Sequence, residues 1–296
     1  MISPEVLQGF DLMLWLGNGR DAAALNGCSQ PTISRQAQQV ADLLGLSLQK
    51  LRGQWRVRGD TTLLSFERQL HQLHRFLGRA PLRLEIGAVS GRMIGLPAPP
   101  GWIAGPADQI DLPRSLQLLR DRVIDAWITP AADDLPQLED PDWQRFDLYA
   151  APIWLVASSN HPLVGHSWLK ASDLRRFPSA GVEGGWYPHS EAHLRSLGLW
   201  SKPVRLNRYE VSRWDGRTAD GHTLAYASPP MLQLNPDLRR LPYNLGLSHC
   251  VALVVHRDHA QAQQVVALRQ ELYKRTETLF NLHPDLLPRR PGGKAG

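Results

Sequence analysis

The stretch NGCSQPTISRQAQQVADLLG, residues 26–45, contains the signals for a turn, a helix start and an amphipathic helix. It opens with an Asn-Gly pair, a common turn sequence, and Ser29 is a residue type that accepts a backbone N–H at a helix start. Pro31 falls in the first turn, where its missing N–H costs no hydrogen bond. The pattern therefore predicts a helix that begins near Gln30, and Gly45 predicts its end.

This helix is predicted to have one apolar and one polar face. Apolar residues recur at the helical period at Ile33, Ala37, Val40 and Leu44. The other face carries groups that can bond to base edges or phosphates, at Gln30, Thr32, Ser34, Arg35 and Gln38. Upstream, GRDAAAL (19–25) predicts a short helix with a small surface that a second helix can cross. Two helices joined by such a turn are typical of the helix-turn-helix, although helical hairpins also occur in proteins that never bind nucleic acid.

The run from Phe10 to Gly45 resembles the N-terminal domain of LysR-type transcriptional regulators. An aromatic residue is followed by paired alanines, then by SQPTISRQ and a closing Leu-Gly. The resemblance implies a recognition helix in the DNA major groove. The residues that it implies for DNA binding in this segment are Ser29, Gln30, Pro31, Thr32, Ser34, Arg35 and Gln36.

Positive charge is concentrated between residues 49 and 80, where seven basic residues occur with two acidic ones. This surplus equals the net charge of +5 of the whole chain. Within it, QKLRGQWRVRGD (49–60) predicts two short strands with glycines at the turns. In a winged helix-turn-helix such a hairpin lies against the phosphate backbone, so we expect contacts from Arg52, Arg56 and Arg58. A solvated basic loop is the alternative.

Residues 61–78 (TTLLSFERQLHQLHRFLG) predict the clearest helix of the chain. Its heptad seam consists of Leu63, Phe66, Leu70, Leu73 and Leu77. Such a seam packs either into its own chain or against the same helix of a second subunit. LysR-type regulators have a dimerisation helix here, so the resemblance implies a dimer or a tetramer. His71 and His74 are expected to be polar flanks of this helix rather than metal ligands.

Beyond Pro81, strand and helix signals alternate. Strands are predicted at 82–86, 123–129, 151–158, 223–228 and 250–256, and helices at 115–122 and 261–276. The alternation predicts an α/β fold with largely parallel sheets, whose ligands bind at the carboxyl ends of the strands. The segments LRLEIGAVS, LLRDRVIDAWI and PIWLVASSNHPL resemble the LysR effector domain, which is two-lobed like a periplasmic solute-binding protein.

The implied fold is an N-terminal all-α winged helix-turn-helix with a linker helix, followed by an α/β two-lobed domain like that of periplasmic binding proteins. The predicted boundaries are 1–60 for the winged helix-turn-helix, 61–80 for the linker helix and 81–285 for the effector domain. Lobe I is expected at about 81–158 and 258–285, and lobe II at about 159–257. A disordered tail is expected at 286–296.

The resemblance also implies an effector site. Ser90 stands where family members often hold an anionic effector at a helix start, and a capping role is the alternative. Its expected neighbours in the site are Gly91, Arg92, Thr129 and Pro130. The implied partners are double-stranded DNA, a second copy of the chain and a small effector, for which an anion is one option. RNA polymerase is a further option.

Other classes of protein have weaker support. HSEAH (189–193), in an apparent loop, matches no zinc pattern, and no nucleophile elbow, Walker loop or dinucleotide fingerprint occurs. We therefore expect no enzyme activity, no metal and no cofactor. With two distant cysteines and neither a signal peptide nor a membrane span, the chain is expected to be soluble and cytoplasmic.

Two alternatives to a DNA-binding regulator stay open. One is a two-lobed sensor of small molecules or proteins that has lost DNA binding, which departures from the family pattern at Asn26, Ala41 and Gln49 motivate. The other is an enzyme on the solute-binding fold, for which no acid–base pair stands out.

Overall fold

The computed structural model describes residues 2–51, 53–182, 184–204, 206 and 208–288. The chain divides into two compact units. Unit 1 comprises Met1–Glu85, Ala98–Pro106 and Arg114–Trp127, and unit 2 comprises Ile86–Pro97, Ala107–Pro113 and Ile128–Gly296.

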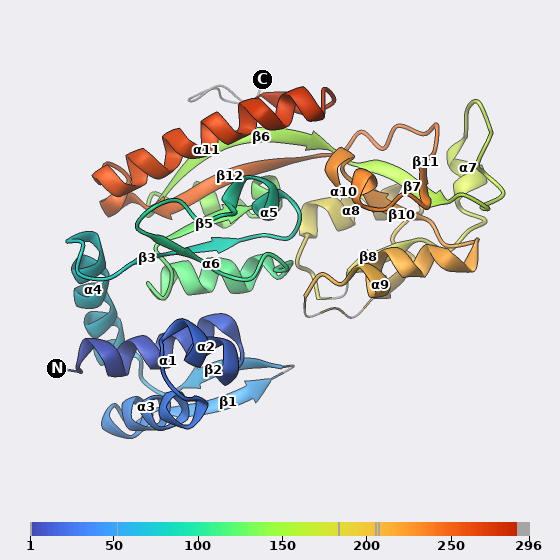
Figure 1. Ribbon diagram of the computed structural model, residues 1–296. Coiled ribbons are helices and arrows are strands. Elements are labelled where there is room, and N and C mark those ends of the chain that lie inside the picture. The colour runs from blue at the N-terminus through green and yellow to red at the C-terminus, as the bar shows by residue number, and fades with distance from the viewer. Residues whose placement is uncertain (1, 52, 183, 205, 207, 289–296) are drawn as a thin grey trace. The chain divides into compact units, whose positions relative to one another are not determined.

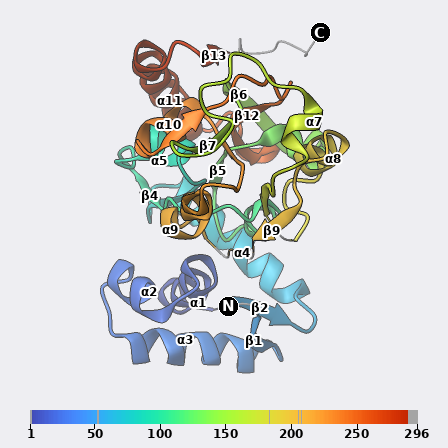
Figure 2. The same ribbon diagram turned by 90° about the vertical axis from the view of Figure 1, so that its right-hand side faces the viewer.

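Unit 1 begins with three helices and a β-hairpin: α1 (Pro4–Leu16), α2 (Gly19–Leu25), α3 (Gln30–Leu43), β1 (Ser47–Leu51) and β2 (Gln54–Arg58). α1 packs against α2 and α3 (Figures 1 and 2), and its buried Leu7 and Phe10 contribute to an apolar core with Ile33 and Val40 of α3. β1 and β2 pair antiparallel. The predicted helices at 19–25 and from Gln30, and the hairpin that follows them, are confirmed.

The rest of unit 1 contains a longer helix and part of a sheet. Its elements are α4 (Thr62–Phe76), β3 (Leu82–Ile86), β4 (Trp102–Ala104), α6 (Leu112–Arg120) and β5 (Ala126–Thr129); β3, α6 and β5 each have one end in unit 2. The strands lie in the order β5, β3, β4, and β3 pairs parallel with β4. The predicted helix at 61–78 and the strand at 82–86 are thus confirmed.

α4 has two faces of opposite character. The predicted heptad residues are exposed by 45 to 76%, and they are Leu63, Phe66, Leu70, Leu73 and Leu77. The buried face is largely polar instead, with Leu64, Arg68, His71, Gln72 and Arg75. The apolar seam therefore remains uncovered within the described part of the chain.

Two aspartates hold the buried face of α4 in unit 1. Arg68 donates to Asp11 Oδ1 of α1 at 2.8 and 2.9 Å from Nη2 and Nε. Asp125 accepts from Arg75 Nε and Nη2 at 2.8 Å each, from Gln72 Nε2 at 3.0 Å and from the backbone N–H of Arg83 at 2.9 Å. Since buried charges are costly unless they are paired, these contacts account for the burial of Arg68 and Arg75.

Unit 2 holds most of the α/β part. Its helices are α5 (Ser90–Gly95), η1 (Ala132–Asp134), η2 (Pro136–Glu139), α7 (Ala171–Leu174), α8 (Pro188–Ser196), α9 (Val211–Trp214), η3 (Asp215–Asp220), α10 (Pro229–Leu234), η4 (Arg257–His259) and α11 (Gln263–Leu282). Its strands are β6 (Trp143–Pro152), β7 (Trp154–Ser158), β8 (Ala180–Val182), β9 (Lys202–Val204), β10 (Ala225–Ala227), β11 (Leu238–Arg240), β12 (Ser248–His256) and β13 (Leu287–Pro288).

The strands of unit 2 form three sets. One has the order β13, β6, β12, β5, the second β10, β7, β11, and the third pairs β8 with β9. Figure 1 shows α11 running along β6, where Tyr273 of α11 donates to the Asp147 carbonyl at 3.4 Å. Arg275 of α11 also donates to the carbonyls of Ile94 and Pro97 at 2.9 and 2.8 Å, so α11 anchors the segment that contains α5.

The prediction of largely parallel sheets is wrong for β6, β7 and the strands that pair with them, whereas β8 and β9 of unit 2 do pair parallel. β6 pairs antiparallel with both β12 and β13, and β7 pairs antiparallel with β10 and β11. β7, at the end of the predicted lobe I, pairs with β10 and β11 of the predicted lobe II. β12, at the end of the predicted lobe II, lies beside β6.

Two local expectations also need correction. HSEAH lies in helix α8, not in a loop. Leu287 and Pro288 pair with Ala150 and Tyr149, so the predicted disordered tail is wrong for these two residues, and its residues 289–296 lie outside the described ones. Among the described residues, no helix combines the length and apolar character needed to cross a membrane.

Candidate functional site

The exposed start of α3 is the first candidate site. Ser29 caps the helix by accepting from the Thr32 N–H at 3.3 Å, and the two hydroxyls lie 2.9 Å apart. The side chains of Gln30, Ser34 and Arg35 are exposed, as is Pro31, and Thr32 is half-buried. These predicted residues therefore share the accessible N-terminal face of α3.

Gln36 differs from this group. A Cβ added at Gly9 of α1 would lie 2.0 Å from Gln36 Oε1, so the amide is packed at the crossing of α1 and α3. Its Oε1 is buried, with no hydrogen-bond partner among the described residues. Gln36 is half-buried and its amide packs against α1, unlike the exposed Gln30 and Arg35, so its DNA contact stays a prediction.

The hairpin of β1 and β2 presents further cations. Arg56 and Arg58 are exposed on β2, and Lys50 lies 5.6 Å from the ring centroid of Trp55 across the hairpin. The predicted contact Arg52 lies outside the described residues. The surplus charge of residues 49–80 is not all at this surface, since Arg68 and Arg75 are buried and paired with aspartates.

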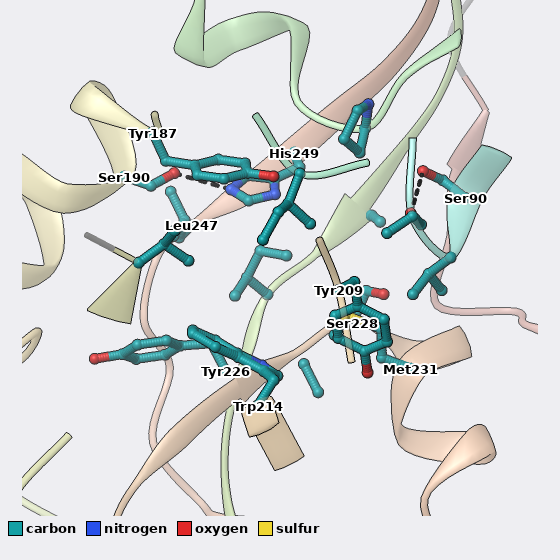
Figure 3. Close-up of a pocket in the computed structure, with 18 of the residues that line it drawn as sticks. Ser90, Tyr187, Ser190, Tyr209, Trp214, Tyr226, Ser228, Met231, Leu247 and His249 are labelled. Carbon is teal, nitrogen blue, oxygen red and sulfur yellow. Dashed lines mark hydrogen bonds between the residues drawn. The ribbon is translucent and has the colours of Figure 1, made fainter. Parts of the chain in front are cut away.

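The second candidate site is a cavity of about 150 Å³ within unit 2. Its wall is formed by the turn before α5, by β6 and β12, and by residues of α8, α9, β10 and α10. In Figure 3, His249 and Tyr187 lie at one end, and Trp214 and Tyr226 at the other.

Only part of the predicted effector site lines this cavity. Ser90 and Pro130 are among the lining residues. Gly91 packs on Ile86, where an added Cβ would lie 2.8 Å from the Ile86 Cβ, and Arg92 is exposed. Thr129 is buried, and its hydroxyl accepts from the Ala131 N–H at 3.4 Å. The predicted roles of Gly91, Arg92 and Thr129 are therefore not supported by their positions.

The turn that carries Ser90 has an unusual backbone. Val89 has φ 60° and ψ −74°, and the Ser90 N–H donates to the Ala88 carbonyl at 2.8 Å. This is a γ-turn with positive φ, a rare and strained conformation, and a β-branched residue is especially uncommon there. The Ser90 hydroxyl also donates to the Ala88 carbonyl, at 3.3 Å (Figure 3).

Three polar residues form a chain at the other wall. The Ser190 N–H and hydroxyl donate to the buried Asp134 carboxylate at 2.8 and 2.6 Å. Ser190 Oγ lies 2.9 Å from His249 Nε2, and the Tyr187 ring stacks on the imidazole at 6.0 Å between centroids (Figure 3). Burial lowers the pKa of His249, with Asp134 as the main opposing influence.

Known structures have the same overall fold. No family model and no curated protein matches the sequence. A full-length OxyR variant from Pseudomonas aeruginosa is 14% identical with a TM-score of 0.57, covering 92% of this chain and 95% of that one. CbnR, a LysR family transcriptional regulator, is 14% identical with a TM-score of 0.52, covering 92% and 99%. Full-length CbnR complexed with its target DNA is 16% identical with a TM-score of 0.51, covering 93% of this chain and 99% of that one.

The fold is that of a full-length LysR-type regulator. The LysR-type fold spans both units, which agrees with the resemblance noted in the sequence for residues 10–45 and for the three segments between residues 82 and 163.

Several lining residues of the cavity were absent from the sequence-based prediction. Tyr187, Ser190, Trp214, Tyr226 and His249 come from four separate elements, and no motif joins them. The one available signal was Pro188, a typical first residue of a helix, which would have placed Tyr187 and Ser190 at a helix start. Within the described residues, no group of three or more His, Cys, Asp or Glu side chains is placed to hold a metal ion.

The buried histidines predict how stability depends on pH. Burial lowers the pKa of His71, His161, His249 and His283. Below about pH 6.5 the unfolded chain therefore binds more protons than the folded one, so the free energy of unfolding should fall as the pH falls. Urea unfolding at about pH 7.5 and pH 5.5 measures this, and His249→Asn should reduce the dependence. The exposed His166→Asn is the matched control. Equal stability at both pH values would contradict the prediction.

Proposed function

We propose that the chain is a DNA-binding transcriptional regulator of the LysR type, controlled by a small molecule bound in the cavity of unit 2. The observation that carries this proposal is the accessible polar face at the start of α3, which follows α2 after a short turn and is accompanied by a basic hairpin. A recognition helix and a wing have this arrangement in winged helix-turn-helix proteins.

α3 has the chemistry for reading DNA in the major groove. Gln30 and Arg35 are exposed and can each make two hydrogen bonds to one base, the amide to adenine and the guanidinium to guanine. Ser34 of α3 and the exposed Arg56 and Arg58 of the hairpin would contact phosphates, which give affinity without sequence preference. CbnR, whose fold the chain shares, has been solved with its target DNA.

The domain boundaries follow from the same proposal. Residues 1–60 would form the winged helix-turn-helix, 61–80 the linker helix and 81–285 the effector domain. The exposed leucine seam of α4 would pair two subunits, because an apolar surface of this length gains free energy when it is covered. A two-fold dimer places two recognition helices on successive half-sites of DNA.

Control by the effector requires two arrangements of the oligomer. Binding in the cavity would favour one of them and change the spacing of the half-sites or the bend of the DNA. The coupling cannot exceed the difference in effector affinity between the two arrangements. RNA polymerase is a further partner under this proposal.

The test is fluorescence anisotropy of the purified protein on DNA from upstream of its own gene, at several salt concentrations and beside a scrambled duplex. The Gln30→Ala/Arg35→Ala variant should lose about five- to 150-fold in specific affinity per lost base contact, since such contacts contribute about 1 to 3 kcal/mol each. Gln137→Ala/Arg176→Ala, at exposed positions of unit 2, is the control. Weak binding that is equal on scrambled DNA and indifferent to α3 would favour the sensor hypothesis.

A further inference from the structure

The wall of the unit 2 cavity is aromatic and apolar. Tyr187 stacks on His249 at one end. At the other end, Trp214 and Tyr226 also line the cavity (Figure 3). Trp200 stacks on Tyr226 at 5.9 Å between ring centroids. Aromatic faces of this kind pack well against a flat ring. A cavity near 150 Å³ is the size that holds a benzene-like molecule in other proteins.

The described lining contains no charged partner for an ion. Among the described lining residues there is no Lys, Arg, Asp or Glu. Burial raises the pKa of Tyr187 and, to about 12, that of Tyr226, so both phenols stay protonated at neutral pH. An ion placed against these described residues would lose hydration without a compensating charge from them, which disfavours a charged ligand.

The hydrogen bonds around His249 determine which ring nitrogen accepts. The carboxylate of Asp134 takes the only hydroxyl proton of Ser190, so Ser190 Oγ must accept the proton carried by His249 Nε2. In a neutral imidazole the other nitrogen, Nδ1, is then an unprotonated acceptor. No described residue donates a hydrogen bond to it, and His249 lines the cavity.

We propose that this cavity binds an uncharged aromatic molecule of about one ring, which donates a hydrogen bond from a hydroxyl or ring N–H to Nδ1 of His249. This ligand would be the effector of the regulator under the proposed function. Only its role as an effector, and not its binding to the cavity, rests on that function. At the other end, the Trp214 Nε1–H is buried without a partner in the described part of the chain, so it is available to an acceptor on the ligand.

The test uses phenol, toluene and benzoate as probes of the full chain in isothermal titration calorimetry. Phenol and toluene have nearly the same shape, but only phenol can donate. Phenol should bind about three- to tenfold more tightly than toluene, the value of one net hydrogen bond, and benzoate should bind more weakly than phenol. Equal binding of phenol and toluene would overturn the assignment to His249, and tightest binding by benzoate would overturn the uncharged class.

Two variants test whether His249 causes the preference for a ligand that donates a hydrogen bond. His249→Phe keeps an aromatic ring but removes the acceptor, so the ratio of phenol to toluene affinity should fall to about one. Ser190→Ala leaves the imidazole in place but removes the group that holds the proton on Nε2, and should also lower the ratio. His166→Phe, at an exposed histidine, should keep the wild-type ratio. An unchanged ratio in the first two variants, with circular dichroism like that of the wild type, would contradict the proposal.

Anisotropy on DNA with the same preparations separates the two proposals. Preferential phenol binding by a protein that does not bind DNA specifically would leave the cavity assignment standing and remove the regulator. Specific DNA binding without a preference for phenol would leave the regulator standing and remove the cavity assignment.

Discussion

An Asp125→Ala variant is expected to lose about 3 to 5 kcal/mol of its free energy of unfolding, because removal of one partner of a buried ion pair leaves the other charge unpaired. Asp125 is fully buried and accepts four hydrogen bonds, two of them from Arg75, whose side chain is only 5% exposed. The substitution would leave these donors without their acceptor inside unit 1. Urea titration followed by circular dichroism measures the loss.

The matched control is Asp142→Ala, which removes an aspartate from an exposed position. Surface substitutions of this kind usually change stability by less than about 0.5 kcal/mol. A loss of similar size in both variants would show that the contacts of Asp125 contribute little to stability.

The second large effect is expected in self-association. A Leu70→Asp/Leu73→Asp variant should convert the assembled protein to monomers in sedimentation velocity, since a paired α4 seam would have to bury two carboxylates among apolar side chains. Each leucine that the assembly covers contributes about 1.5 to 3 kcal/mol, and that contribution is also lost. Because both leucines are exposed in the single chain, its own fold should be preserved.

Ser65→Asp/Gln69→Asp adds the same charge at exposed positions of α4 outside the seam. This variant should assemble as the wild type does. If the leucine variant also assembles normally, the linker helix has no role in holding the subunits together.

Local patterns explain why unit 1 was the more predictable part. α2, α3 and the hairpin follow from capping residues, turn glycines and helical periodicity, all of which act over a few residues. The packing of the Gln36 amide against α1 was missed because it depends on how closely α1 approaches α3, which the small Gly9 allows. Likewise, the local sequence does not indicate that Arg68 is buried, because its partner Asp11 lies 57 positions away in the chain.

Tertiary contacts explain the errors in unit 2. Most of β6 was missed, since the predicted strand at 151–158 overlaps β6 only at residues 151 and 152. Polar residues interrupt the apolar pattern of β6, and its partner β12 lies about a hundred positions away. Ser90 came from the family resemblance. His249 and Ser190 are in contact only because β12 and α8 are adjacent in the folded chain, and neither residue belongs to a motif that predicts this contact.

The backbone of Val89 also limits the thermodynamics of ligand binding. A residue held at such a φ stores about 1 to 3 kcal/mol of conformational energy. A ligand whose complex lets Val89 return to a negative φ would gain that energy, which corresponds to a change in affinity of about five- to 150-fold. By reciprocity, a partner that stabilises the relaxed turn would strengthen ligand binding by the same factor. The strain energy of Val89 is therefore the upper limit of the coupling free energy that relaxation of this turn can supply between the ligand and the partner.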